Sequence, residues 1–347
     1  MLVSIVINNY NYAAYLASAI RSALDQTYRP LEVIVVDDGS TDSSREVLSQ
    51  FDSVIQTVLK PNGGQASALN AGFRLCHGTV VIFLDSDDTL KPDAVAKVVD
   101  RWEHNCSKIQ YPLEVIDDDG SPTGEIYPPH ALSSGNLIPC LLKSGSYNTA
   151  PTSGNAFAYA FLSKVMPIPE TTWPSHADCY LIHLAPFYGS VGTVCEPLGS
   201  YRVHARSLSL SGIVVEGQVR VGKLRKELLR DLAQQQLIRN HCALFGYTMN
   251  DTVMTDRYSH YKIRLASLKS APAEHPFSED RLHAVALGLI RRAWKDPDIF
   301  LVKRILLTMW AVALSLLPRV SCEGLIAQAI ASPSRRRFID RVARCDA

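Results

Sequence analysis

The chain has 347 residues, with 35 basic and 34 acidic side chains, so its formal net charge is +1. A charge this close to zero argues against a nucleic-acid partner, since such proteins usually carry a marked basic excess. Hydrophobic residues make up 47% of the chain and charged residues 20%, which excludes a disordered protein. The length suffices for one large α/β domain and a smaller one.

The N-terminus and the cysteines both point to a cytoplasmic protein. The first residues, MLVSIVINNYN, lack a basic stretch and a long apolar core, so they predict a strand and not a signal peptide. None of the eight cysteines falls in a Cys-x-x-Cys pair or at a zinc-binding spacing. We therefore expect reduced thiols.

The first hundred residues alternate between apolar strands and amphipathic helices. The expected strands are 3–7, 31–36, 54–59 and 80–84, and the expected helices are 12–24, 43–51, 65–75 and 92–102. Strands that are apolar on both faces and separated by helices predict a parallel sheet covered on both sides.

The pattern is weaker beyond residue 102. We expect a strand over 111–116, a tight turn at Asp117–Gly120 and an irregular loop over 121–150. From residue 217 onward the spacing predicts mainly helices, over 219–241, 280–294 and 298–317. These patterns divide the chain into an α/β domain over 1–215 and a helical region over 216–347.

Polar residues follow three of the expected strands. Asn8–Asn11 follows the first strand, Asp37–Asp42 the second and Asp85–Asp88 the fourth. Ligands of parallel α/β sheets bind beyond the carboxyl ends of the strands. We therefore expect all three segments to meet at one edge of the sheet and to form a ligand site.

Asp85 and Asp87 are the candidate metal ligands. They stand two residues apart after a buried strand, and carboxylate oxygens suit Mg²⁺ or Mn²⁺ shared with a substrate phosphate. The alternative is a set of solvated loop acids in which Asp88 or Thr89 caps the next helix. We predict the metal site, because adjacent buried carboxylates repel one another and a cation offsets that cost.

Asp37 and Asp38 are candidates for binding a nucleoside. Either one can accept the imide N–H of uracil or a ribose hydroxyl, although an Asx turn is the alternative. No glycine-rich dinucleotide or phosphate loop is present. We therefore expect the metal to hold any bound phosphate.

Four segments, in this order and spacing, strongly resemble family 2 glycosyltransferases of the GT-A fold: VSIVINNYN, VIVVDDGSTD, NGGQASALNAG and FLDSDD. The resemblance covers roughly residues 1–210. It implies a Rossmann-like, mostly parallel sheet flanked by helices, and the helical pattern from residue 217 onward adds a C-terminal helical extension. It also implies a nucleotide-sugar half over 1–100 and an acceptor half over 101–215.

The resemblance assigns donor-site residues by matching position. Asn8 and Asp38 would contact the base, and Asp85 and Asp87 would form the D-x-D pair that touches the ribose and a divalent cation. The other matching positions are Asn62, Gly64 and Asn70, in the donor-site loop and the helix after it. Leu69 stands where the family often has an arginine. Any contact that this arginine makes in the family is therefore in doubt here.

Asp178 is the candidate general base. The segment from His176 to His204 resembles the acceptor half of the family, in which an aspartate before a helix is the base. Inverting transfer needs a carboxylate that takes the proton of the acceptor hydroxyl. A helix cap between Ser175 and Cys179 is the alternative.

Two further groups have less specific roles. His204 is expected either to ligate the metal or to contact the diphosphate together with Arg202 or Arg206, with a structural histidine as the alternative. Trp173 and His176 precede the proposed base, where they would stack on an acceptor sugar or belong to the core or a lid.

The C-terminal run over 305–317 is apolar but short for a membrane span. One interpretation is a buried helix. The other is an interfacial helix over 299–317 on the inner leaflet, assisted by the basic tail. The basic residues concerned are Arg291, Arg292, Lys295, Arg335, Arg336, Arg337, Arg341 and Arg344.

The sequence thus predicts an inverting, metal-dependent glycosyltransferase. We expect a UDP-sugar donor and, as acceptor, a glycan or lipid-linked molecule in cell-surface polysaccharide synthesis, at the inner face of the plasma membrane. A GT-A-fold assembly protein without activity and a sugar-phosphate nucleotidyltransferase are the alternatives. The intact Asp85, Asp87 and Asp178 argue against the first. The absence of a glycine-rich basic loop at Asn8–Tyr12 argues against the second.

Overall fold

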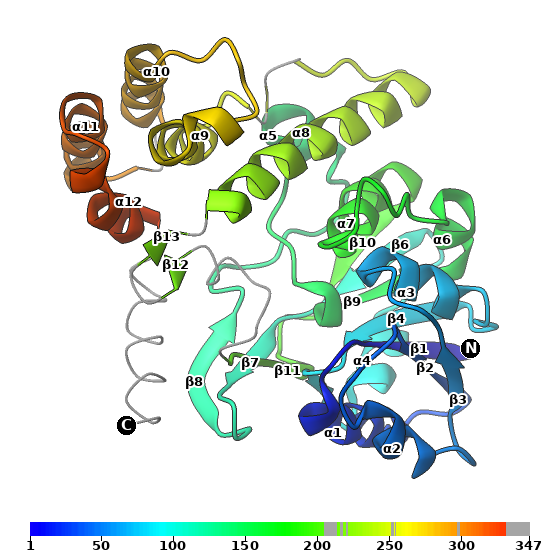
Figure 1. Ribbon diagram of the computed structural model, residues 1–347. Coiled ribbons are helices and arrows are strands. Elements are labelled where there is room, and N and C mark those ends of the chain that lie inside the picture. The colour runs from blue at the N-terminus through cyan, green and yellow to red at the C-terminus, as the bar shows by residue number, and fades with distance from the viewer. Residues whose placement is uncertain are drawn as a thin grey trace. The chain divides into compact units, whose positions relative to one another are not determined.

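The computed structural model describes residues 1–204, 214–215, 218–219, 221–250, 253, 255–296 and 299–330 (Figure 1). The chain divides into two compact units, which we describe separately. The first unit comprises Met1–Val203 and His241–Tyr247, and the second comprises His204–Asn240 and Thr248–Ala347. The domain boundary expected after residue 215 and the division of the first domain at residue 100 stay predictions.

A seven-stranded mixed sheet forms the centre of the first unit. Its strands are β1 (Val3–Asn9), β2 (Leu31–Asp37), β3 (Gln56–Leu59), β4 (Val80–Asp85), β6 (Cys106–Gln110), β9 (Asn155–Ala158) and β10 (Ser190–Thr193). Their order is β10-β6-β9-β4-β1-β2-β3. Strand β1 is parallel to β2 and β4, whereas β9 is antiparallel to β4 and β6. The predicted mostly parallel sheet is confirmed.

Helices cover both faces of this sheet (Figure 1). The helices α1 (Ala13–Leu24), α2 (Ser44–Ser49) and α4 (Ala94–Asp100) share one core with Ile5 and Ile82. The helices α3 (Gln65–Phe73), α6 (Tyr159–Val165) and α7 (Ala177–Tyr188) lie on the opposite face. Val6 points to that face because side chains alternate along a strand. A Cβ on Gly72 of α3 would lie 2.3 Å from Val6 Cγ1, so only glycine permits this close approach.

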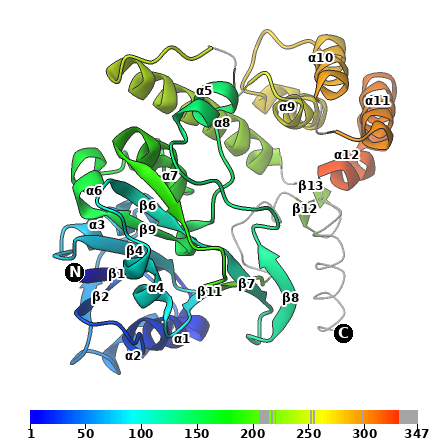
Figure 2. The same ribbon diagram turned by 180° about the vertical axis from the view of Figure 1, so that it is seen from behind.

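A second sheet contains β5 (Thr89–Leu90), β7 (Leu113–Ile116), β8 (Pro122–Tyr127) and β11 (Gly199–Arg202), in the order β5-β11-β7-β8 (Figure 2). The predicted turn between β7 and β8 is confirmed, with Gly120 at φ +88° and its N–H donating to the Asp117 carbonyl. The prediction of an irregular loop over 121–150 is wrong. That stretch contains β8, the exposed edge strand, and α5 (Ile138–Ser144). The short 3₁₀ turn η1 (Thr152–Gly154) precedes β9.

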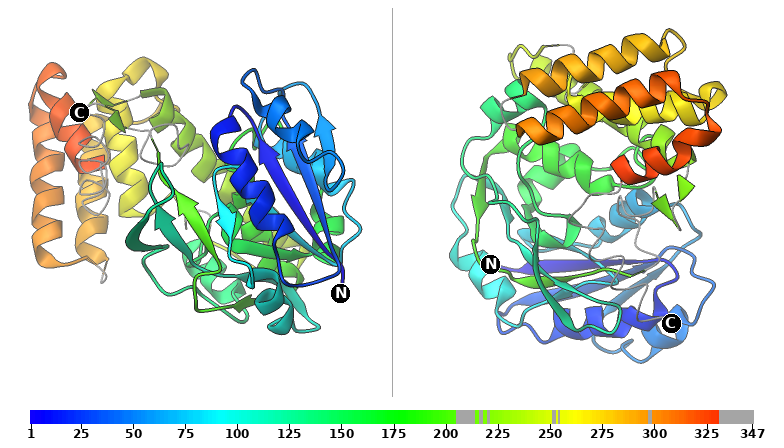
Figure 3. Two further views of the ribbon diagram at one scale, coloured as in Figure 1. Left: turned by 90° about the horizontal axis from the view of Figure 1, so that it is seen from below. Right: turned by 90° about the vertical axis from the view of Figure 1, so that its left-hand side faces the viewer.

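The described part of the second unit is mainly helical. It contains the two-stranded ribbon β12 (Val214–Val215) and β13 (Gln218–Val219) and most of α8 (Val221–Leu244). The helices that follow are α9 (Tyr258–Ser270), α10 (Leu282–Lys295), α11 (Leu301–Leu316) and α12 (Glu323–Ile330), with the 3₁₀ turns η3 (Pro272–Glu274) and η4 (Val320–Cys322). Helices α9, α10 and α11 pack side by side around Leu265, Leu289 and Leu314 (Figure 3). The predicted C-terminal helical extension is therefore confirmed.

Helix α11 is apolar on both its buried and its exposed face. Leu307, Trp310, Ala311 and Leu314 are buried against the neighbouring helices, whereas Leu306 and Met309 are 59% and 64% exposed. The segment over 305–317 is therefore buried along one face only, and the interfacial helix stays a prediction. Among the described residues, no helix combines the length and the hydrophobicity needed to cross a membrane.

The seven cysteines of the described chain are free thiols.

Candidate active site

The carboxyl ends of β1, β2 and β4 meet at one edge of the sheet. Two asparagines at the end of β1 each bond to a carboxylate, one on each neighbouring strand. Register places Asn8 opposite Asp85 of β4 and Asn9 opposite Asp37 of β2. Asn8 Nδ2 donates to Asp85 Oδ1 at 3.0 Å, and Asn9 Nδ2 donates to Asp37 Oδ1 at 2.9 Å. The two consecutive amides therefore orient one acid on each neighbouring strand.

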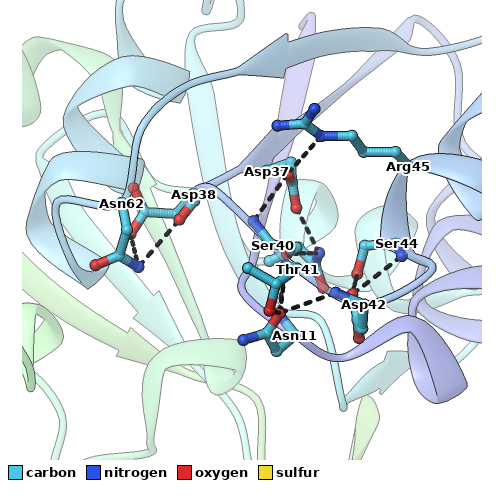
Figure 4. A network of polar contacts seen from close by, with 10 residues as sticks. Asn11, Asp37, Asp38, Ser40, Thr41, Asp42, Ser44, Arg45 and Asn62 are labelled. Atoms are coloured by element: carbon cyan, nitrogen blue, oxygen red, sulfur yellow. Dashed lines mark hydrogen bonds and ion pairs between the residues drawn. The ribbon is translucent and has the colours of Figure 1, made fainter.

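The adjacent carboxylates of Asp37 and Asp38 point in opposite directions (Figure 4). Asp37 accepts the backbone N–H of Ser40 at 3.2 Å and lies 3.8 Å from Arg45 Nε. These contacts stabilise the turn after β2. The Asx-turn alternative that the sequence left open thus applies to Asp37, and Asp38 is the carboxylate that faces the neighbouring loop.

The buried Asp38 carboxylate organises the segment over 60–64. It accepts the backbone N–H groups of Gly63 at 3.0 Å and Gly64 at 2.7 Å, and the side-chain amide of Asn62 at 3.2 Å. Lys60 forms an ion pair with the same carboxylate. The predicted donor-site residues Asp38, Asn62 and Gly64 are therefore brought together, while their contact with a nucleotide sugar stays a prediction.

Asp85, at the end of β4, and Asp88, in the loop after it, both have raised pKa values. Burial raises the pKa of Asp88 well above its ordinary value, with the charges of Asp87 and Asp85 adding to the effect. The Asp88 carboxylate accepts hydrogen bonds from the Ser153 hydroxyl at 2.6 Å and from the backbone N–H of Arg202 at 2.9 Å. These two bonds connect the loop after β4 to η1 and β11. Although Asp85 keeps part of its surface exposed, the protein around its carboxyl group raises its pKa from 3.8 to about 7.

Asp178 lies within electrostatic range of this cluster. It stands in the first turn of α7 and is half-buried. Burial is the main cause of the raised pKa of Asp85, and the negative charges of Asp87 and Asp178 raise it further. The negative charge of Asp178 also acts on the buried Lys108. Burial lowers the pKa of Lys108 well below its ordinary value, and Asp178 opposes this shift. The charge of the predicted base therefore reaches Asp85 of the predicted metal pair.

Sequence reasoning missed Gln65, which links the two parts of this site. Gln65 Nε2 donates to Asp85 Oδ1 at 3.4 Å, and Gln65 Oε1 accepts the backbone N–H of Ala177 at 3.0 Å. Its own backbone N–H donates to the Pro174 carbonyl at 3.0 Å. The signal available in the sequence was an uncharged polar side chain at the start of a helix, directly after two glycines.

Arg202 holds two loops through their backbone carbonyls. Its Nε donates to the Asp87 carbonyl at 3.0 Å, and Nη1 donates to those of Asp117 and Asp118 at 3.0 and 2.8 Å. The guanidinium also lies over the Tyr15 ring, 4.9 Å from its centroid. Arg202 therefore fixes the loop that carries Asp87, and its predicted contact with the donor stays a prediction.

Asn70 is buried and bonded at both ends of its amide. Its Oδ1 accepts the Ile168 N–H at 2.7 Å, and its Nδ2 donates to the Ile168 carbonyl at 2.9 Å and to Glu170 at 3.2 Å. The residue thus fastens α3 to the segment that follows α6. These contacts give Asn70 a structural role, and its predicted donor contact stays a prediction.

Two other predicted residues lie in buried positions. Trp173 is 2% exposed and packs edge-on against Tyr180 at 6.1 Å between ring centroids, so it belongs to the core and does not offer a face to a sugar. His204 is buried and is the first residue of the second unit. Its role as a metal ligand stays a prediction.

The residues at this edge fit a hard divalent cation. Asp85 and Asp87 supply carboxylate oxygens whose mutual repulsion a cation would relieve. Asn8 Oδ1 is a further buried oxygen, and it lacks a hydrogen-bond partner among the described residues. No group of three or more His, Cys, Asp or Glu side chains in the described chain forms a complete metal site. Two carboxylates would leave the other coordination positions to donor oxygens and water, as Mg²⁺ often does.

Comparison with known proteins identifies the family. Residues 4–136 match the model of glycosyl transferase family 2. A protein of Nostoc sp. named as an uncharacterized glycosyltransferase is 36% identical over 217 residues, which cover 61% of this chain and 67% of that protein. TuaG of Bacillus subtilis, a putative teichuronic acid biosynthesis glycosyltransferase, is 32% identical over 151 residues, and the chain spans 60% of its length. The chain belongs to glycosyltransferase family 2 and is a glycosyltransferase.

Solved structures identify the fold. The crystal structure of S. aureus TarS 1–349 in complex with UDP-GlcNAc has a TM-score of 0.50 at 15% identity, covering 95% of this chain and 91% of that chain. The mannosyltransferase PcManGT from Pyrobaculum calidifontis, in complex with GDP-Man and Mn²⁺, has a TM-score of 0.50 at 15% identity, covering 94% and 84%. The predicted GT-A fold is confirmed.

Replacing Asp38 with alanine should destabilise the first unit strongly. The change leaves two backbone N–H groups and the Lys60 ammonium without their buried acceptor, which costs about 3–5 kcal/mol. Urea unfolding followed by circular dichroism measures the loss. The matched control is Asp52→Ala at an exposed position, and an equal effect of the two variants would contradict our interpretation of Asp38.

Replacing Asp85 with asparagine should stabilise the metal-free protein in a pH-dependent way. Because the folded protein raises the pKa of Asp85 from 3.8 to about 7, the stability linked to this group is present below pH 4 and is lost as the pH rises through 7. The gain from Asp85→Asn should be about 2 kcal/mol larger at pH 8 than at pH 5. Thermal unfolding with a metal chelator measures the gain at both pH values. Asp52→Asn controls for the loss of one charge, and a gain independent of pH would refute the assignment.

Proposed function

We propose that this chain is an inverting, metal-dependent glycosyltransferase that uses a nucleotide-sugar donor. The observation that carries the proposal is that Gln65 bonds both to Asp85 and to the first turn of α7, which holds Asp178, while Asp87 follows Asp85 in the next loop. Two of these acids follow the central strand β4, where ligands of α/β sheets bind, and the third begins a helix in the acceptor half. This arrangement suits one carboxylate that moves a proton and a pair that holds a cation.

The proposed roles follow from the chemistry of sugar transfer. Asp178 takes the proton of the acceptor hydroxyl while that oxygen attacks the anomeric carbon, and the nucleoside diphosphate leaves from the opposite side. The transition state has oxocarbenium character, as in other glycosyl chemistry. Asp85 and Asp87 would hold Mg²⁺ or Mn²⁺, which supplies charge neutralisation for the diphosphate. Asn8 and Gln65 orient Asp85 through their side-chain amides.

The donor and acceptor are proposed at the level of chemical class. A structure of TarS holds UDP-GlcNAc and one of PcManGT holds GDP-Man with Mn²⁺, which supports a nucleotide-sugar donor and a divalent ion here. We favour a UDP-sugar, the class of donor that the TarS complex contains. The acceptor is a glycan or a lipid-linked molecule in polysaccharide synthesis. The name of the relative TuaG supports this class.

Two variants should separate donor binding from catalysis. A panel of nucleotide sugars is first screened for a rise in melting temperature with and without Mn²⁺, because ligand binding stabilises the native state by mass action. Asp87→Ala should lose the metal-dependent part of that rise. Asp178→Asn should keep the rise and lower turnover by at least about a hundredfold.

The products distinguish the proposal from its alternatives. Release of a nucleoside diphosphate supports a transferase, and release of pyrophosphate would indicate a nucleotidyltransferase. Binding without turnover in the presence of cell-envelope acceptors would indicate an inactive assembly protein. Normal turnover by Asp178→Asn would refute the assignment of the base. Gln50→Met, an exposed change in the turn after α2, serves as the control.

We further propose that α11 docks on a lipid surface. The helix presents an exposed apolar stripe at three- to four-residue spacing, opposite the face that packs in the core. The exposed residues are Val302, Ile305, Leu306, Met309, Val312 and Leu316, preceded by Phe300 and Leu301. Trp294 of α10 is 46% exposed, and its indole N–H donates to Thr308 of α11 at 3.0 Å, which adds an aromatic ring beside the stripe.

The charges around this stripe favour anionic lipid over a second copy of the chain. Arg291 and Lys295 at the end of α10 are exposed, as are Lys303 at the start of α11 and Arg319 after its end. Cationic side chains beside an apolar helix face are attracted to the anionic cytoplasmic leaflet. A symmetric dimer through the same stripe would bring these cations toward one another. Peripheral docking would suit a lipid-linked acceptor.

Introducing charge into the stripe should abolish this docking. The double variant Leu306→Glu and Met309→Glu should lower binding to vesicles of phosphatidylcholine and phosphatidylglycerol by at least about tenfold. Co-sedimentation measures the bound fraction, and vesicles of phosphatidylcholine alone should bind wild type weakly. Val54→Glu, in the first unit, is the control at another exposed apolar position. Unchanged vesicle binding, or a wild-type dimer that the double variant dissociates, would refute the lipid assignment.

A further inference from the structure

Gln65 connects two segments that are distant in sequence. It is the first residue of α3, 20 positions from Asp85 and 112 positions from Ala177. One end of its amide donates to the Asp85 carboxylate, and the other end accepts the Ala177 N–H. A single side chain thus spans the gap between the end of β4 and the start of α7.

The backbone around Gln65 is fitted to the segment that leads into α7. Gly64 has φ +85°, and a Cβ there would lie 2.5 Å from the Pro174 carbonyl oxygen. Any other residue at this position would therefore be strained and would push the two segments apart. The Gln65 N–H donates to that same carbonyl. The close approach that Gly64 permits brings the glutamine amide within reach of Ala177.

The contact with Ala177 satisfies a need at the start of α7. The first N–H groups of a helix have no partner within the helix. His176 occupies the N-cap position with φ +56°, and it makes no side-chain capping hydrogen bond. Gln65 Oε1 supplies an acceptor for this end of the helix from another part of the chain. Asp178 is the next residue after Ala177, so the same bond fixes the turn that carries it.

We propose that Gln65 is a positioning residue, which sets the Asp178 carboxylate relative to Asp85 by bonding to both Asp85 and the first turn of α7. The inference rests on the proposed function, in which Asp178 is the base. Gln65 acts through Asp178 and takes no part in the chemistry. A displacement of a reacting group by about 1 Å lowers the rate about a hundredfold.

The test is a double-mutant cycle on the release of nucleoside diphosphate from the donor that the thermal screen selects. Gln65→Met keeps the length of the side chain and removes both bonds. It should lower kcat by about tenfold to a hundredfold. The thermal shift from donor and Mn²⁺ should stay close to that of wild type, because the shorter bond from Asn8 Nδ2, at 3.0 Å, still holds Asp85. In an Asp178→Asn background the same change should alter the residual rate by less than about twofold, because Gln65 acts through Asp178. Gln50→Met should match wild type.

A second measurement needs neither donor nor turnover. Hydrogen exchange of the peptide that contains Ala177–Cys179 should be faster in Gln65→Met and unchanged in Gln50→Met. If Gln65→Met does not fold, Gln65→Glu keeps an acceptor for the Ala177 N–H, and it should preserve the slow exchange of this peptide. A wild-type kcat in Gln65→Met, an equal loss in both backgrounds or unchanged exchange would overturn the inference. A wild-type rate in Asp178→Asn would instead refute the proposed function.

Discussion

The structure of the first unit depends on keeping carboxylates together at the end of a buried strand. Asp85 ends β4 and Asp88 follows it, and burial together with the charge of Asp87 raises the pKa of both groups. Donors from surrounding elements stabilise this arrangement, since Asn8 bonds to Asp85 and Ser153 bonds to Asp88. The unfavourable charge is retained at the place where a parallel sheet binds its ligands, which is the behaviour expected of a functional site.

The same constraint explains why loops distant in sequence are fixed so firmly around that edge. Asp38 orders the segment over 60–64 through backbone N–H groups, and Arg202 orders the loop after β4 through backbone carbonyls. Gln65 then joins Asp85 to the helix of Asp178. Because a mispositioned reacting group slows a reaction strongly, the mechanism that we propose also depends on side chains that only hold their neighbours.

The second unit obeys a different constraint. Its helices bury one apolar face of α11, and Met309 and Leu316 lie on the other face, which stays exposed. Exposed apolar area of this extent is unfavourable in water and is typical of an interaction surface. The exposed cations Lys303 and Arg319 at the ends of this helix are the reason why we propose an anionic lipid surface as its partner.

The sequence by itself determined the elements over the first hundred residues, because runs such as 31–36 and 80–84 are apolar enough to be strands wherever they pack. It also determined that the polar ends of β1, β2 and β4 lie at one edge of the sheet, because parallel strands end at the same edge. Only the tertiary structure decided the rest. Strands β6, β9 and β10 are short and lack alternation, and β9 inserts antiparallel between β4 and β6 from residues far along the chain. The partners of Gln65 and Asn70 lie about a hundred positions away, and no local pattern encodes such bonds. The exposed face of α11 was equally invisible, since a helix that is apolar all round does not reveal which side its neighbours cover.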